Sequence, residues 1–164
     1  MEQNPGQLEA EQLIKNFEGL SLRSYKKDND RWTIGWGNTF WENGKAVLPS
    51  DLAITTERAE SLFDFWIDKT YNAVQKEIPN ASFNQLAAYT SLAYNIGIEA
   101  FINSTSLKNF KANDLKLAAQ TLEWFNQAGG HVLKGLQRRR RAESLVLNGM
   151  AVPEAIQKGI EAFA

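Results

Sequence analysis

The chain has 164 residues, of which 43% are apolar and 23% charged, and this length suffices to bury a hydrophobic core. Its 18 Lys and Arg residues against 19 Asp and Glu give a formal net charge of −1, so no global basic surplus indicates a nucleic-acid binder. The absence of cysteine excludes disulfide scaffolds, thiol proteases, Cys-based zinc sites and iron–sulfur clusters, and a lone His cannot build a multi-His metal centre. We therefore expect no metal and no cofactor.

The N-terminal segment, residues 1 to 13, is polar and contains Glu2, Glu9 and Glu11, so it lacks the basic and apolar regions of a signal peptide. No uninterrupted apolar run in the chain approaches the roughly 18 residues that a membrane-spanning helix needs. We therefore expect a soluble protein that is made in the cytoplasm and does not insert into a membrane.

The first half of the chain predicts one helix and one strand region. The helix covers residues 8 to 18, where apolar residues fall on one side and Gly19 follows as a stop signal. Residues 24 to 47 form the only predicted strand region, because apolar residues alternate there with small or polar ones. Within that region Asn43-Gly44 offers a tight turn between two extended runs.

From Thr55 onward the sequence predicts helices alone. The first runs to about Ile78, just before a proline, and has cap candidates and glutamates at its start. The next begins with the capping box Ser82-Phe-Asn-Gln85 and ends at Gly97. Further helices are predicted at about 99–111, 114–127, 135–148 and 153–163.

This order of elements predicts the α+β class. We expect a single domain, residues 1–164, made of two lobes. The N-terminal lobe covers about 8–56 and holds the short antiparallel sheet, a long connecting helix covers about 56–78, and an all-helical lobe covers about 79–164. A cleft between the two lobes is the expected place for a ligand site.

A glycine pair and the single histidine each have a functional and a structural explanation. Gly35-Trp-Gly37 does not fit a dinucleotide fingerprint, because the third glycine position is Phe40 and the segment does not open a helix. The two glycines indicate either the close approach of another backbone or a ligand, or a structural bulge. His131 lies in a predicted loop, and no Gly-x-Ser-x-Gly motif accompanies it that would supply the nucleophile of a Ser-His-Asp triad.

The four consecutive cations Arg138 to Arg141 fan over a whole helical turn, so they cannot form one flat basic stripe. We expect a solvated and partly ion-paired helix face, with Glu143 nearby. Contact with an anionic polymer is the alternative.

Glu18 is the leading candidate for chemistry. It ends the first helix just before the strand that carries Thr33, so its carboxyl group can point into the junction of the lobes. Partial burial there would raise the pKa of Glu18 and keep it protonated near neutral pH, whereas an ordinary surface glutamate is the alternative. Asp28 and Asp30 follow in a turn, and two carboxyl groups flanking a groove are what glycoside hydrolysis needs.

Several segments of this chain resemble the phage-type lysozymes, or endolysins, of glycoside hydrolase family 24. The resemblance is strongest at Trp32-Thr-Ile-Gly-Trp-Gly-Asn-Thr39, which looks like the hallmark Thr-Ile-Gly-x-Gly strand of the family. It covers residues 8 to 148 and includes these further segments in the order of the family: Phe17-Glu-Gly19, Leu22-Arg-Ser-Tyr25, Phe83-Asn-Gln-Leu-Ala-Ala88, Tyr94-Asn-Ile-Gly97, Phe101 with Ser104-Thr105, and residues 124 to 140.

The resemblance implies that Glu18 is the general acid and that Thr33 lies on the cleft wall and helps to hold the hydrolytic water or the substrate. In the family an Asp, or sometimes a Cys, stands two residues after the position of Tyr25, but this chain has Lys27 there. Asp28 is the nearest replacement. A Lys ammonium is neither a carboxylate base nor a stabiliser of an oxocarbenium-like transition state, and pairing with Glu18 would keep that carboxylate ionised.

The resemblance also implies saccharide contacts at Thr39, Tyr94, Asn95 and Ser104. Sugars are bound by hydrogen bonds from amides and hydroxyls, with an aromatic ring against their apolar face. The alternatives are a core position for Tyr94 and a helix-cap role for Ser104.

The function implied is that of a muramidase, which hydrolyses the β-1,4 bond between N-acetylmuramic acid and N-acetylglucosamine in bacterial peptidoglycan and so lyses cells. Glu18 would protonate the leaving oxygen while a water held by Thr33 and activated by Asp28 attacks, with inversion. Lys27 motivates an alternative, a catalytically impaired module that binds peptidoglycan or a protein partner; a chitinase-like activity is a further one. We expect a monomer that reaches the cell wall after release, with the help of a holin.

Overall fold

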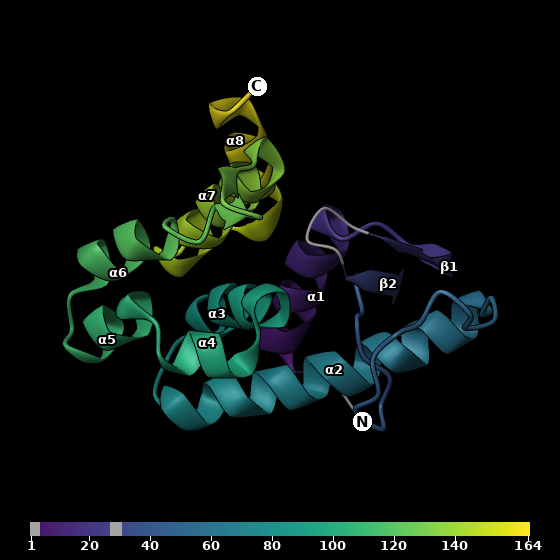
Figure 1. Cartoon of the computed structure of the whole chain (residues 1–164). Helices are drawn as coiled ribbons and strands as arrows, with labels where there is room; N and C mark the ends of the chain where they lie inside the picture. The colour runs from purple at the N-terminus through teal and green to yellow at the C-terminus, as the bar shows by residue number, and fades with distance from the viewer. Residues whose placement is uncertain (1–3, 27–30) are drawn as a thin grey trace.

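The computed structural model describes residues 4–26 and 31–164 (Figure 1). In these residues the chain forms eight helices and two small antiparallel sheets of two strands each. This mixed, helix-dominated architecture confirms the α+β prediction. The elements in chain order are α1 (Pro5–Phe17), β1 (Ser21–Lys26), β2 (Trp32–Gly35), α2 (Thr56–Glu77), α3 (Phe83–Ile96), α4 (Ile98–Ile102), α5 (Thr105–Lys111), α6 (Leu115–Leu122), β3 (Gln127–Ala128), β4 (His131–Val132), α7 (Lys134–Leu147) and α8 (Val152–Ala162).

Helix α1 begins at Pro5, earlier than the predicted residue 8. Asn4 is the N-cap, and its side chain accepts a hydrogen bond of 2.8 Å from the backbone N–H of Gly6. A proline is well suited to the first helical position because its missing N–H would have no partner there in any case. The predicted apolar face is correct, since Leu13 and Ile14 are both fully buried.

The main sheet pairs β1 with β2, with Tyr25 opposite Thr33. The predicted second extended run, toward Val47, is wrong: that part of the chain forms isolated bridges instead of a strand. The predicted turn at Asn43-Gly44 is present, and the backbone N–H of Gly44 donates to the carbonyl of Trp41 at 2.9 Å. Val47 and Trp41 of this segment pack in a small apolar cluster.

The two long helices have the predicted boundaries. Thr55 caps α2, accepting from the backbone N–H of Arg58 at 3.0 Å, and α2 ends at Glu77. The capping box of α3 is present in full between Ser82 and Gln85.

Two of the shorter predicted helices are wrong in extent. The predicted helix at 99–111 is two helices, α4 and α5, because Ser104 starts a new helix by capping it. The predicted helix at 114–127 ends at Leu122, and a hairpin of β3 and β4 follows, with Gly129 and Gly130 at its turn. His131 therefore lies in a strand and not in a loop. Helices α7 and α8 agree with the prediction within one residue.

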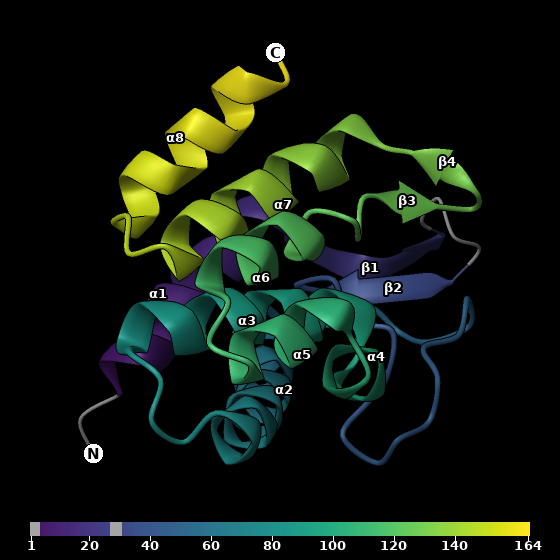
Figure 2. The same cartoon turned by 90° about the vertical axis from the view of Figure 1, so that its left-hand side faces the viewer.

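Two apolar clusters hold these elements together. The larger one is built on α3, whose residues from Leu86 to Ala93 are all buried, and it includes residues from α1, α2, α7 and α8 (Figure 2). The smaller one consists of Ile34, Val47 and Leu62, with tryptophans packed around it. Helix α2 contributes to both clusters and so joins the sheet to the helices. No helix among the described residues is long and apolar enough to cross a membrane.

Candidate active site

Glu18 lies at the C-terminal end of α1, where the helix meets the sheet. Its backbone N–H still donates to the carbonyl of Ile14 at 2.7 Å, so the helix fixes the position from which the side chain starts. The side chain is only 4% exposed, and Oε1 lies 2.6 Å from Nη1 of Arg139 on α7. The alternative, a surface glutamate, is therefore wrong, and the predicted burial at the junction is confirmed.

Gly37 brings the backbone of the sheet segment directly against this carboxyl group. A Cβ atom at this position would lie 2.5 Å from Cδ of Glu18 and closer still to Oε2. The backbone of Gly37 also has a φ of +77°, a conformation that other residues rarely adopt. The group packed against Gly37 is thus the Glu18 side chain, whereas the glycine pair was expected to admit another backbone, a ligand or a bulge.

Thr33 is a buried residue of β2, paired with Tyr25 of β1. It is not among the described residues that line the cavity beside Gly37. It is 1% exposed, and its hydroxyl donates to the backbone carbonyl of Arg31 at 3.2 Å. Its proposed contact with a hydrolytic water stays a prediction. Asp28 and Lys27, on which the second catalytic group depends, lie outside the described residues.

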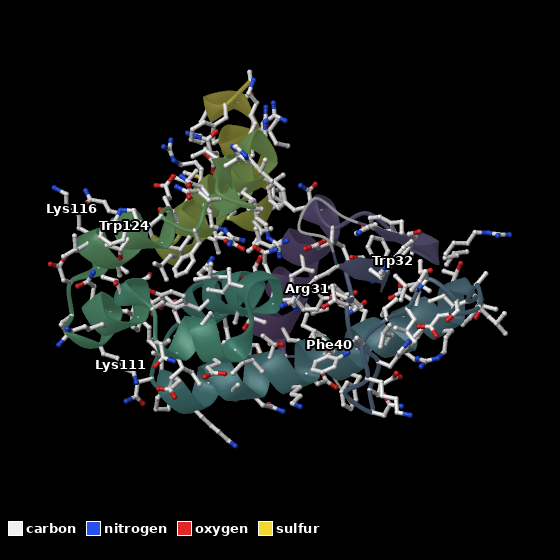
Figure 3. The ribbon with its side chains drawn as sticks, in the orientation of Figure 1. Arg31, Trp32, Phe40, Lys111, Lys116 and Trp124 are labelled. Carbon is white, nitrogen blue, oxygen red and sulfur yellow. The ribbon has the colours of Figure 1, made fainter. Side chains whose placement is uncertain are left out.

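A cavity of about 200 Å³ opens beside Gly37, between the sheet segment and α2, α3 and α4. Arg31 and Phe40, which line it and are both exposed, lie where the sheet segment meets the helices (Figure 3). Three of the predicted saccharide contacts also line this cavity: Thr39, Tyr94 and Asn95.

Tyr94 is held by two hydrogen bonds that cross from α3 to the sheet segment. Its hydroxyl donates to the backbone carbonyl of Trp36 at 2.7 Å and accepts from Nδ2 of Asn38 at 2.9 Å. Burial and the negative charge of Glu18 raise the pKa of Tyr94, so its hydroxyl stays protonated. The Tyr94 hydroxyl thus links α3 to the sheet segment, as a core position would, and the residue also lines the cavity, as a saccharide contact requires.

Ser104 has the helix-cap role that was given as the alternative. Its side chain is buried and accepts from the backbone N–H of Leu107 at 3.1 Å, at the start of α5. It is not among the described residues that line the cavity. A saccharide contact by Ser104 stays a prediction.

The arginine run fans around α7 as predicted, but its expected solvation is wrong for two members. Arg139 and Arg140 are 3% and 1% exposed, and both pair with Glu143, which is fully buried. Arg138 donates to the carbonyl of Phe163, and Arg141 pairs with Glu123 at 2.6 Å. The four side chains point in different directions, so two of them fall on the face of α7 that packs into the molecule.

Arg139 is the residue of this site that sequence reasoning missed. The signal was present: Arg139 and Glu143 have the (i, i+4) spacing of one helix face, the same face that carries the buried Ala142 and Val146. The charge of Arg139 and Glu143 predicts a solvated surface, whereas their spacing relative to Ala142 and Val146 places them on the buried face of α7.

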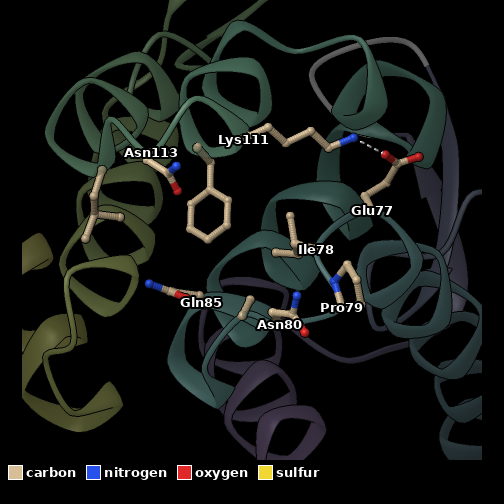
Figure 4. Close-up of a pocket in the computed structure, with 10 residues that line it drawn as sticks. Glu77, Ile78, Pro79, Asn80, Gln85, Lys111 and Asn113 are labelled. Atoms are coloured by element: carbon tan, nitrogen blue, oxygen red, sulfur yellow. Dashed lines mark hydrogen bonds and ion pairs between the residues drawn. The ribbon is translucent and has the colours of Figure 1, made fainter.

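A second cavity, of about 440 Å³, lies elsewhere, between the end of α2, the start of α3 and the α5–α6 turn (Figure 4). Its charged lining residues, Glu77 and Lys111, pair with each other at 2.5 Å. It shares no lining residue with the cavity beside Gly37. Within the described residues no group of three His, Cys, Asp or Glu side chains is placed to hold a metal ion.

A helix-dominated body joined to a small sheet, with a carboxyl group buried where the two meet, places the chain in the lysozyme-like class of folds. It matches the phage lysozyme family over residues 15–143. The solved structure of an endolysin from Escherichia coli O157:H7 phage FAHEc1 superposes with a TM-score of 0.73 and 33% identity, covering 91% of this chain and 94% of that one. The chain belongs to the phage lysozyme family.

Two relatives show how far the similarity extends along each protein. The endolysin of Bacillus phage PZA is 33% identical over 150 residues, which are 90% of this chain but 56% of that protein. The endolysin of Acyrthosiphon pisum secondary endosymbiont phage 1 is 36% identical over 136 residues, 80% of this chain and 89% of that protein. The chain thus spans about half the length of the Bacillus phage endolysins it matches.

Proposed function

We propose that this protein is a muramidase that hydrolyses the β-1,4 bond between N-acetylmuramic acid and N-acetylglucosamine in bacterial peptidoglycan. The observation that carries the proposal is the buried carboxyl group of Glu18 against Gly37, a residue that lines a cavity with hydroxyl, amide and aromatic side chains. Membership of the phage lysozyme family supports it.

In this proposal Glu18 donates a proton to the leaving oxygen as the glycosidic bond breaks. A water molecule held by Thr33 and activated by Asp28 attacks the anomeric carbon from the opposite face, which inverts its configuration. Such a reaction needs the two carboxyl groups about 6.5 to 9.5 Å apart, so that the water fits between them.

Thr39, Tyr94 and Asn95 are the proposed saccharide contacts in the cavity. A hydroxyl, an aromatic ring and a carboxamide are suited to a sugar that carries an acetamido group. The half-exposed ring of Phe40 and the indole of Trp66 line the same cavity and add apolar surface for the sugar.

We further propose that the protein acts as a monomer of two lobes, in the division expected from the sequence, and that its partner is peptidoglycan. The name endolysin, which its relatives carry, supports a role in cell lysis. Release to the cell wall with the help of a holin belongs to the same proposal.

The test is digestion of purified peptidoglycan sacculi by the parent protein, Glu18→Gln and Glu154→Gln. Glu154 is a matched control, because its carboxylate is exposed on α8. We expect new reducing ends that are N-acetylmuramic acid from the parent and the control, and none from Glu18→Gln. Sacculi that are bound without any new reducing end would support a binding module instead, and reducing ends of N-acetylglucosamine would contradict the bond assignment.

A further inference from the structure

Behind Glu18 lies a buried ionic cluster whose role the proposed reaction does not explain. Glu18, Arg139, Arg140 and Glu143 are each at most 4% exposed, so none of the four charges is solvated. Burial of charges is costly unless each finds a partner in good geometry. The ion pairs between these two arginines and two glutamates therefore determine how much positive charge lies next to each carboxylate.

Arg139 is shared between the two carboxylates. Its Nη1 lies 2.6 Å from Oε1 of Glu18, and its Nε lies 3.3 Å from Oε2 of Glu143. Its Nη2 donates to the backbone carbonyl of Ser91 on α3 at 3.1 Å, which fixes the plane of the guanidinium. The charge of Arg139 is thus divided between the Glu18 carboxyl group, which packs against Gly37, and the fully buried Glu143.

Glu143 is itself fixed from two sides. The hydroxyl of Ser91 donates to its Oε2 at 2.5 Å, and Nε of Arg140 lies 2.6 Å from its Oε1. It is fully buried and is not among the residues that line the cavity beside Gly37. Arg139 is the residue that contacts both Glu143 and Glu18.

We propose that Glu143 is a positioning residue for Glu18: it holds the Arg139 guanidinium between two carboxylates, so that Glu18 meets only part of its charge. The inference rests on the proposed role of Glu18 as the general acid. Such an acid must carry its proton at the working pH, and an unshared guanidinium at this distance would favour the ionised carboxylate instead.

The charge balance of the cluster gives the sign of the effect. With both carboxyl groups ionised, two negative and two positive charges cancel, and protonation of Glu18 leaves one positive charge in excess. Without the charge of Glu143 the same protonation leaves two, so Glu18 would hold its proton less well. Arg139 and Arg140 from α7 and Tyr94 from α3 face the two carboxylates, and Tyr94 stays neutral because its pKa is raised.

The experiment is a pH titration of the Glu18 side-chain carboxyl carbon by NMR in the full chain, with Glu143→Gln and Arg139→Gln beside the parent. We expect Glu143→Gln to lower the pKa of Glu18 by about one unit or more and Arg139→Gln to raise it. Glu77→Gln, which removes one carboxylate of an ion pair elsewhere, is the control and should leave the titration unchanged. In activity measurements the alkaline limb of the pH profile should move with the Glu18 pKa.

Glu143→Asp keeps the charge but sets it one methylene farther from Arg139, so it should give a smaller shift of the same sign. It tests the inference if Glu143→Gln does not fold. An unchanged Glu18 titration in the Glu143 variants, or a shift in the direction of Arg139→Gln, would overturn the inference. The titration needs no turnover. If the variants show the expected pKa shifts but the parent does not cleave peptidoglycan, the proposed function alone is refuted.

Discussion

Gly37→Ala tests whether the close approach of the sheet backbone to Glu18 shapes the site. The added Cβ would lie 2.5 Å from Cδ of Glu18, so the carboxyl group must move away from its present position. That movement threatens the buried ion pair with Arg139, whose two partners are 3% and 4% exposed. The variant should therefore lose both stability and activity.

The loss of stability in Gly37→Ala has two parts, a backbone cost and a steric cost, and a substitution at a second glycine separates them. A residue other than glycine in a left-handed conformation costs about 1 to 2 kcal/mol. Gly44 has nearly the same backbone conformation, with a φ of +82° against +77°, but a Cβ there meets no atom within 4 Å. Gly44→Ala should therefore show the backbone cost alone.

Breaking a buried ion pair costs about 3 to 5 kcal/mol, and partial relaxation reduces this figure. We expect Gly37→Ala to be at least about 2 kcal/mol less stable than Gly44→Ala in urea unfolding. In a domain of this size that difference corresponds to roughly 4 to 8 °C in Tm. The rate of peptidoglycan hydrolysis should fall in Gly37→Ala and stay near the parent value in Gly44→Ala.

Equal destabilisation of the two variants, together with full activity of Gly37→Ala, would refute this reasoning. It would mean that the Glu18 carboxyl group is free to move aside at little cost, and that its contact with Arg139 is not required. A loss of activity in both variants to the same extent would point to a general effect on the sheet segment.

Three further predictions concern single hydrogen-bonding groups. Tyr94→Phe should cost about 1 to 3 kcal/mol in urea unfolding, because it leaves the buried amide of Asn38 without its acceptor; a change near zero would contradict this. Ser104→Ala should cost about 1 kcal/mol through the lost helix cap and leave the affinity for chitooligosaccharides, measured by calorimetry, unchanged; a weaker affinity would favour the saccharide contact. The hydrogen bonds from Arg58 hold the pKa of Glu42 below its usual value, so this pair stabilises the fold above pH 4.5 and the gain is lost as the pH falls through the lowered pKa. Glu42→Gln should accordingly be less stable than the parent by under about 1 kcal/mol at neutral pH and equally stable in acid, as thermal unfolding at both pH values would show.

The helices were predictable where local signals mark their ends. The caps at Thr55 and Ser82 satisfy backbone donors that lie within the same few residues, so the sequence alone reveals them. The hairpin after α6 was missed because strands of two residues are too short to show a period. The pair Gly129-Gly130, at the turn, was its one local signal.

The site was predictable in part for a similar reason. Glu18 is predictable as a candidate and as a buried carboxyl group because it combines a position at a helix end with a family motif, both of which are local in sequence. Its partner Arg139 lies 121 residues farther along the chain, and nothing near Glu18 in sequence indicates it. Long-range pairing of this kind depends on how α1 and α7 pack against α3, which no short motif encodes.

Glu18, the proposed general acid, and its buried ionic partners lie on different helices, α1 and α7. In the proposed reaction, Glu18 at the end of α1 delivers the proton, and the charges on α7 influence how strongly that proton is held. Substitutions on α7 can therefore alter the pH at which the acid is protonated without changing a residue that lines the cavity. Because Arg139 is anchored to the backbone of α3 as well as to Glu143, even a small shift of α7 against α3 would change the 2.6 Å contact with Glu18. If Glu18 is the general acid as proposed, the packing of α7 against α3 therefore influences its protonation through the Arg139 guanidinium.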